Sequence, residues 1–190
     1  NICDLKHITM KYSQFVILVV LTISISGCAT KRAILTSMPQ DNNIMLEGKP
    51  IDIEIIDLRN EITQRQLRIP IMTWPGQKDK IQPPLTDFQR KLIEENILLH
   101  FNQSNQEFKV KCKIDEGFQE FTAHAFHERE YVQFDIKIEL LDTRDNVIKY
   151  CTSSAFFEVK SLDASNKFIG ELYDKAIITS INECFVKLAD

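Results

Sequence analysis

The sequence predicts an α+β fold: a mainly antiparallel four- to five-stranded sheet with two helices packed on one face. Two observations carry this prediction. Segments that alternate apolar and polar residues, the pattern of half-buried strands, lie at 51–58 and between 108 and 159. Two longer segments with the period of amphipathic helices begin near Thr86 and Ser165. We therefore expect one domain at residues 50–190.

The first expected strand is rich in β-branched residues and alternates isoleucine with acidic side chains from Ile51 to Ile55. It ends in the polar stretch 57–60. The connection that follows runs to Pro84 and is longer than an ordinary link between elements, so it is expected to have a role of its own. Within it, residues 68–74 are predicted as an edge strand, because Pro70 is tolerated at a sheet edge.

The first expected helix begins at a capping box, in which Thr86 is the N-cap and Gln89 stands three residues later. It is expected to run to about Phe101, and the polar stretch 102–106 then ends it. Its buried face is predicted to carry a stripe of apolar residues, namely Phe88, Leu92, Ile93, Ile97 and Leu99.

The following segments predict a meander of antiparallel strands at 108–114 and 121–126, with a bulge near Gly117, then 131–141 and 147–159. A last helix is expected over 165–188. Its apolar stripe is predicted to pack on the sheet face that carries Phe108, Val110 and Ile114, and consists of Gly170, Tyr173, Ile177, Ile181, Cys184 and Leu188.

The N-terminal part has the layout of a secretory signal peptide. After Met10 come the positive Lys11, an apolar run at 15–25 and the small residues before Cys28. The apolar run is too short to span a bilayer comfortably. Residues before Met10 are interpreted as upstream read-through, so residues 1–27 are expected to hold upstream residues and the signal peptide.

The end of that run, Ile25-Ser26-Gly27-Cys28, resembles the lipobox of bacterial lipoproteins. The resemblance implies that Cys28 is lipidated and becomes the mature N-terminus, with residues 28–49 as a tether. It also implies a lipid-anchored protein on the periplasmic face of the outer membrane, because Ala29 replaces the aspartate that signals inner-membrane retention. The alternative is a plain secretory signal that is cleaved near Gly27.

Charge and cysteine content narrow the class of protein. The chain has 23 basic and 27 acidic residues, a net charge of −4, which argues against a nucleic-acid partner.

An exported chain is free to form disulfides. The cysteines after Cys28 allow three interpretations: buried thiols, a bridge from Cys112 to Cys184 or Cys151, or a catalytic or metal-binding thiol.

The sequence offers little catalytic chemistry. Its glycines are isolated, so no phosphate-binding loop or dinucleotide fingerprint exists, and no serine lies in a nucleophile motif. We therefore predict no catalytic, cofactor-binding or metal-binding residue. One alternative is a metal-dependent hydrolase that uses His124, His127 and Glu128. Residues three apart on a strand point to opposite faces, so both imidazoles could reach one metal only if a turn intervenes. We expect a charged hairpin tip that stays solvated.

Ile71, Met72 and Trp74 form an apolar patch in the otherwise polar, proline-rich connection. If Trp74 is buried, it serves as an ordinary core anchor. If it is exposed, the patch is a candidate surface for binding a partner.

The whole pattern is similar to that of two families of bacterial lipoproteins. The lipobox, the Ile-rich strand ending at Asp57 and Arg59, and the terminal INECFVKLAD helix resemble small outer-membrane lipoproteins of the YajG type. Trp74 followed by Pro84-Leu85 resembles the auxiliary lipoproteins of ABC and lipid-transport systems. Neither resemblance implies catalysis. Together they imply a non-enzymatic binding or accessory module of an envelope transport or assembly complex, with a protein or lipid partner; the alternative is a purely structural lipoprotein.

Overall fold

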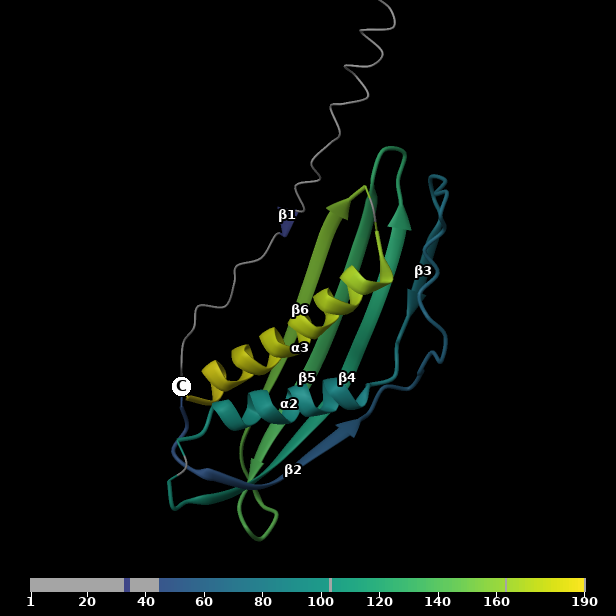
Figure 1. The fold of residues 1–190 in the computed structure, drawn as a ribbon. Helices are drawn as coiled ribbons and strands as arrows, with labels where there is room; N and C mark the ends of the chain where they lie inside the picture. The colour runs from purple at the N-terminus through teal and green to yellow at the C-terminus, as the bar shows by residue number, and fades with distance from the viewer. Residues whose placement is uncertain (1–32, 35–44, 103, 163, 190) are drawn as a thin grey trace, which may run out of the picture. The chain divides into compact units, whose positions relative to one another are not determined.

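The computed structural model describes residues 33–34, 45–102, 104–162 and 164–189 (Figure 1). Within these residues, the sheet has six strands in the order β1-β6-β5-β4-β2, and β3 pairs with β4 beside β2. The elements are β1 (Ala33–Ile34), β2 (Lys49–Asp57), β3 (Lys78–Ile81), α2 (Asp87–Leu99), β4 (Glu107–Ala123), β5 (Glu128–Leu141), β6 (Val147–Ser161) and α3 (Asn166–Ala189).

The α+β class is confirmed, but the sheet is mixed. β2 runs parallel to β4, with Lys49 opposite Glu107 and Asp57 opposite Ile114. The other strand pairs are antiparallel. Parallel neighbours need a long crossover between them, and here the chain makes it through α2. The alternating pattern located β2 but could not give its direction, since parallel and antiparallel strands share the same period.

β4 is one long strand with two partners along the same edge. Its first half pairs with β2, and its second half pairs with β3 from Gln119 to Thr122. The register against β5 shifts between Ile114 and Glu116, where β2 departs. The interruption expected around Gly117 is therefore wrong: β4 continues through it, and the irregularity lies just before.

The edge strand predicted at 68–74 is also wrong, because the strand forms later, at β3. Pro70 and Pro75 have no N–H to donate to a ladder. Gly76 then turns the chain with a φ of 88°, a conformation that favours glycine, and its N–H donates to the Ala123 carbonyl over 2.9 Å. Pairing with β4 starts there.

The capping box of α2 is confirmed. The Gln89 N–H donates to the Thr86 hydroxyl over 3.1 Å, and the Thr86 N–H donates to the Gln89 side-chain oxygen over 3.2 Å. The predicted stripe is partly wrong. Phe88 and Leu99 are 63% and 69% exposed, whereas the buried residues of α2 are Gln89, Ile93 and Ile97. This face is narrow because α2 rests on α3, where the Gln89 amide donates to Asp174 over 2.8 Å.

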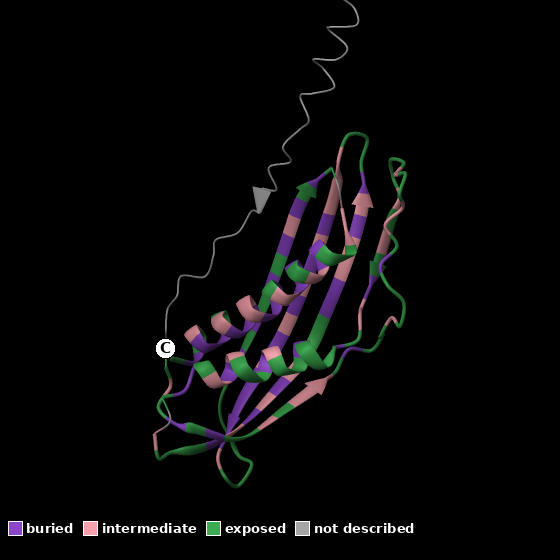
Figure 2. Cartoon of the chain, in the orientation of Figure 1, coloured by how far each residue is buried: buried purple, intermediate pink, exposed green. Residues whose placement is uncertain are grey.

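α3 packs chiefly on β5 and β6, and less on β4. Its residues Tyr173, Ile177, Ile181 and Leu188 are buried as predicted, in one core with Phe108, Val110 and Ile114. Buried and less buried residues alternate along the strands in Figure 2, as expected for a sheet that is covered on one face. Both helices lie in front of the sheet in Figure 1.

Candidate functional site

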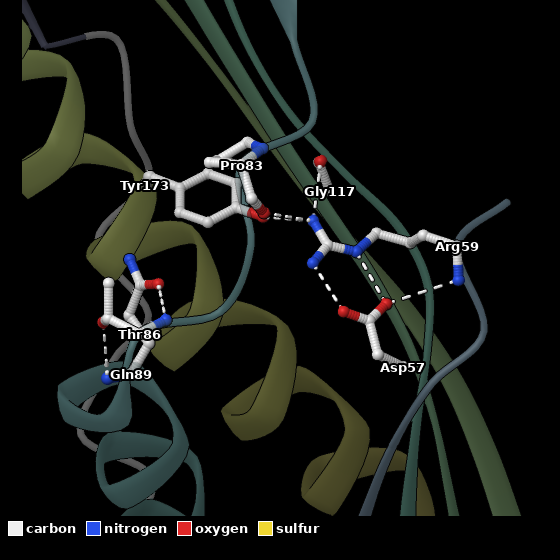
Figure 3. A network of polar contacts seen from close by, with 7 residues as sticks. All are labelled: Asp57, Arg59, Pro83, Thr86, Gln89, Gly117 and Tyr173. Carbon is white, nitrogen blue, oxygen red and sulfur yellow. Dashed lines mark hydrogen bonds and ion pairs between the residues drawn. The ribbon is translucent and has the colours of Figure 1, made fainter. Parts of the chain in front are cut away.

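The long connection after β2 is held at both ends by the buried side chain of Arg59 (Figure 3). Its Nε and Nη2 donate to the Asp57 carboxylate over 2.8 and 2.7 Å. Its Nη1 donates to the carbonyl of Pro83 over 2.9 Å and to that of Gly117 over 3.1 Å, and the Tyr173 hydroxyl accepts from it over 3.3 Å. This network ties the start and the end of the connection to β4 and α3.

The electrostatics of this network follow from the hydrogen bonds. The bond from Arg59 lowers the pKa of Asp57 and outweighs the desolvation that acts in the opposite direction. Burial raises the pKa of Tyr173 well above its ordinary value. The network therefore contains a charged pair beside a neutral phenol. Such an arrangement suits a structural role.

A second set of contacts orders the middle of the connection along β3. The Arg65 guanidinium donates to both oxygens of Asp79 over 2.5 and 2.7 Å, and the Arg68 N–H donates to the same carboxylate over 2.8 Å. Thr63 donates its N–H to the Gln82 carbonyl over 2.7 Å. Leu67 is buried in the core. The connection is thus fixed before and after the apolar patch.

Between these fixed points, the predicted partner-binding residues lie in solvent. The side chains of Ile71, Met72 and Trp74 are 105%, 72% and 64% exposed. The Trp74 N–H donates to the side-chain oxygen of Gln77 over 2.8 Å, which holds the backbone beneath the indole. The interpretation of Trp74 as a core anchor is therefore wrong, because an anchored backbone presents it outward.

Two other segments add apolar side chains at the same end of the sheet. The turn between β4 and β5, closed by a 2.7 Å bond from the His124 N–H to the His127 carbonyl, carries Phe126 at 90% exposure. Leu162, just after β6, is 54% exposed. One open hollow is lined by all three segments, with the lining residues Thr73, Pro75, His124, Ala125, Phe126, His127, Glu128 and Leu162.

We call the five exposed side chains Ile71, Met72, Trp74, Phe126 and Leu162 the apolar tip. The β4–β5 turn and the segment before β3 stand at the same end of the sheet in Figure 1. Thr73 and Pro75 line the hollow with Phe126 and Leu162, which brings the three segments together, although Ile71, Met72 and Trp74 do not line it. Several exposed apolar side chains at one end of a sheet mark a candidate surface for interaction.

The His124–Glu128 stretch forms the solvated turn that was expected. The two imidazole rings stack with centroids 4.7 Å apart. The Glu128 carboxylate accepts the Ala164 N–H over 2.8 Å, so it is directed toward the segment before α3. In the part of the chain that the structure describes, no group of three or more His, Cys, Asp or Glu side chains is arranged to hold a metal ion.

Of the three interpretations of the cysteines, the buried thiol holds for Cys112 and not for Cys151 or Cys184. Cys151 on β6 forms a disulfide with Cys184 on α3, with Cα atoms 5.5 Å apart. A bridge from Cys112 is therefore wrong, and Cys112 is a buried thiol whose pKa burial raises to about 12. Such a thiol is unreactive at neutral pH.

The predicted lipidation site, Cys28, lies outside the described residues. None of the helices in the described part of the chain is long and apolar enough to cross a membrane.

Comparison with known proteins shows that the chain has only limited similarity to them. No model of a protein family matches the chain, and no curated protein matches it. Among solved structures, a Caulobacter crescentus protein assigned as a lipoprotein superposes with a TM-score of 0.39 at 15% identity, covering 55% of this chain and 83% of its own. A minor lipoprotein from Acinetobacter baumannii superposes with a TM-score of 0.35 at 9% identity, covering 76% of this chain and 90% of its own. The overlap is partial in both cases.

Proposed function

We propose that this chain is a lipid-anchored, non-enzymatic binding module of the bacterial envelope, and that the apolar tip is its binding surface. The anchor is Cys28, and the location is the periplasmic face of the outer membrane. The module acts as an accessory to a transport or assembly complex. The observation that carries the proposal is the outward presentation of Trp74 and its neighbours on a connection fixed from both sides.

The many contacts that fix this connection support a role in binding. A loop without a role is free to fold its apolar side chains inward or to lose them. Here Arg59 and Asp79 organise the connection, Leu67 packs into the core, and Ile71 and Trp74 still point outward. A preorganised surface loses less conformational entropy on binding than a mobile one.

The Cys151–Cys184 disulfide supports an exported location. Disulfides persist in the periplasm and other oxidising compartments and are rare in the cytosol. The segment from Met10 to Cys28, which resembles a signal peptide that ends in a lipobox, independently supports export to the envelope.

The proposal is tested by chemical crosslinking in cells followed by affinity purification of the chain. Trp74→Ala is compared with wild type, and Leu99→Ala is the matched control, because Leu99 is equally exposed but lies on α2, away from the tip. A bound component captured by wild type and by Leu99→Ala, and lost with Trp74→Ala, is the expected result. Capture that is indifferent to Trp74, or no capture at all, would remove a protein partner at the apolar tip.

The metal-dependent hydrolase is tested separately. Zinc content of the purified protein is measured for wild type and for His127→Ala. We expect no stoichiometric zinc in either protein. Stoichiometric zinc that disappears with His127→Ala would favour the hydrolase and contradict the proposal.

A further inference from the structure

We propose that the apolar tip docks on the interface of the lipid bilayer that holds the Cys28 anchor. This inference rests on the proposed function, since it names the partner of the same surface. Four features of the described residues lead to it: the place where the N-terminal chain enters the fold, the exposure of the tip, its chemical composition and the charge around it.

The N-terminal chain enters the fold at the end where the tip lies. Ala33 of β1 pairs with Lys160 of β6, and Ile34 pairs with Val159. Lys160 stands two positions before Leu162, a member of the tip. Residues 29–32 alone separate Cys28 from Ala33, a stretch that spans at most about 18 Å when extended. If Cys28 carries the lipid, as proposed above, the length of this stretch limits how far this end of the domain lies from the bilayer.

The opposite end of the sheet lies too far away to meet the same bilayer at once. β4 has 17 residues, from Glu107 to Ala123 beside the tip. At the rise of a strand, this is roughly 55 Å. If the domain stands on the tip, the turn between β5 and β6 therefore projects away from the lipid.

The shape of the tip suits lipid better than protein. Ile71 and Phe126, at 105% and 90% exposure, stand out from the fold and hardly pack on their neighbours. A protein partner would need a matching pocket for each protruding side chain. A bilayer interface accepts them without such complementarity.

The composition of the tip is that of an interfacial membrane contact. Tryptophan is enriched at the headgroup level of bilayers, where its ring is partly apolar and its N–H stays wet. The other members of the tip, Ile71, Met72, Phe126 and Leu162, are apolar and exposed.

Cationic side chains stand beside the tip, although the whole chain has a net charge of −4. Exposed Lys78 and Lys160 flank the tip on β3 and β6. Desolvation first, and then the charges of Lys160, His124 and Arg129, lower the pKa of His127. Lys78 and Lys160 favour contact with anionic headgroups, and the Glu128 carboxylate that lines the hollow acts in the opposite direction. The neighbouring carboxylate of Glu158 is neutralised by its ion pair with Arg129.

The test uses the fluorescence of Trp74, which is the single tryptophan of the chain. The mature lipidated protein is purified from membranes and reconstituted into vesicles of phosphatidylethanolamine and phosphatidylglycerol, with and without brominated acyl chains. We expect Trp74 emission to shift to shorter wavelength in the vesicles relative to detergent-free solution of the delipidated protein, and to be quenched at least twofold by the brominated lipid.

The matched control moves the reporter to the other end of the sheet. Tyr150 is 65% exposed on β6, near the turn between β5 and β6, so Trp74→Phe combined with Tyr150→Trp keeps the tip apolar and places tryptophan away from it. We expect little quenching of this variant. Equal quenching at both positions, or none at Trp74, would overturn the inference.

The outcome is separable from that of the proposed function. If Trp74 is not quenched in vesicles but a Trp74-dependent protein is captured in cells, the lipid inference fails and the binding module stands. If Trp74 is quenched and the control is not, the bilayer is the partner, whatever the capture experiment yields.

Discussion

Replacing Arg59 with methionine is expected to destabilise the fold more than any substitution of an exposed arginine. Methionine keeps an apolar stem of similar length but removes every donor. The side chain of Arg59 is fully buried, whereas that of its partner Asp57 is 20% exposed. The substitution leaves the Asp57 charge and the carbonyls of Pro83 and Gly117 without this donor.

The magnitude follows from that geometry. Removing one member of a buried ion pair reduces the free energy of unfolding by about 3–5 kcal/mol. Partial access of water to Asp57 favours the lower part of this range. Since domains unfold with about 5–15 kcal/mol in total, the loss is readily measured by urea denaturation followed by circular dichroism.

Arg65→Met is the matched control. Arg65 also forms a two-bond pair with an aspartate, Asp79, but its side chain is 39% exposed. Exposed pairs are screened by solvent, so we expect a much smaller loss of stability. Equal losses for Arg59→Met and Arg65→Met would refute the reasoning, because burial would then not decide the strength of the tie.

The same substitution changes the pH dependence of stability. The pKa of Asp57 is lower in the folded chain than its ordinary value of 3.8, chiefly because Arg59 donates to it. Its ionisation therefore stabilises the fold above that value, and this contribution is lost as the pH falls through the folded-state pKa. In Arg59→Met, we expect the acid-side decline of the unfolding free energy to become shallower. An unchanged decline would show that other carboxylates set it.

Three further predictions concern other parts of the chain. Gly117→Ala places a methyl group against the Tyr173 hydroxyl and should reduce the free energy of unfolding by about 1–3 kcal/mol. Adding Tyr173→Phe should recover part of this loss. If the effects of the two substitutions are purely additive, the clash is excluded. Cys184→Ser breaks the bridge to Cys151, which closes a loop with a sequence separation of 33. The free energy of unfolding measured by urea titration should fall by about 2–4 kcal/mol. Reduction of the wild-type disulfide should have the same effect, and an unchanged midpoint of the urea transition would argue against the bridge. Cys28→Ser should abolish metabolic labelling with a palmitate analogue, and label retained in that variant would place the lipid elsewhere.

The positions of the elements were predictable because strands and helices leave different periods in the sequence. The run from Ile51 to Ile55 located β2, and the box formed by Thr86 and Gln89 located the start of α2. These signals are local. The parallel direction of β2 and the exposure of Phe88 and Leu99 on α2 were not predictable, because they depend on how β4 and α3 meet these elements in space.

The candidate site was partly predictable for the same reason. The apolar patch at Ile71, Met72 and Trp74 stood out within a polar connection, and the structure places all three in solvent. Phe126 and Leu162 were missed, because they join the tip only through the pairing of β4, β5 and β6. A phenylalanine within a short charged turn was the signal that could have indicated the first of them.

The Arg59 network shows most clearly what sequence patterns cannot predict. Asp57 and Arg59 were singled out only as the end of the Ile-rich strand, and the other partners of Arg59, namely Pro83, Gly117 and Tyr173, are 24, 58 and 114 positions away. Only the folded topology brings these groups together (Figure 3).

The measurement that tests the central claim most directly is site-specific photocrosslinking in living cells. A photoreactive amino acid is placed at position 72 in the apolar tip and, separately, at position 150 at the far end of the sheet. Met72 and Tyr150 are both well exposed, so the two probes differ mainly in location. Ultraviolet-dependent adducts with an envelope component, lipid or protein, are predicted at position 72 and not at position 150. Adducts of equal yield at both positions, or at position 150 alone, would contradict a binding surface at the tip.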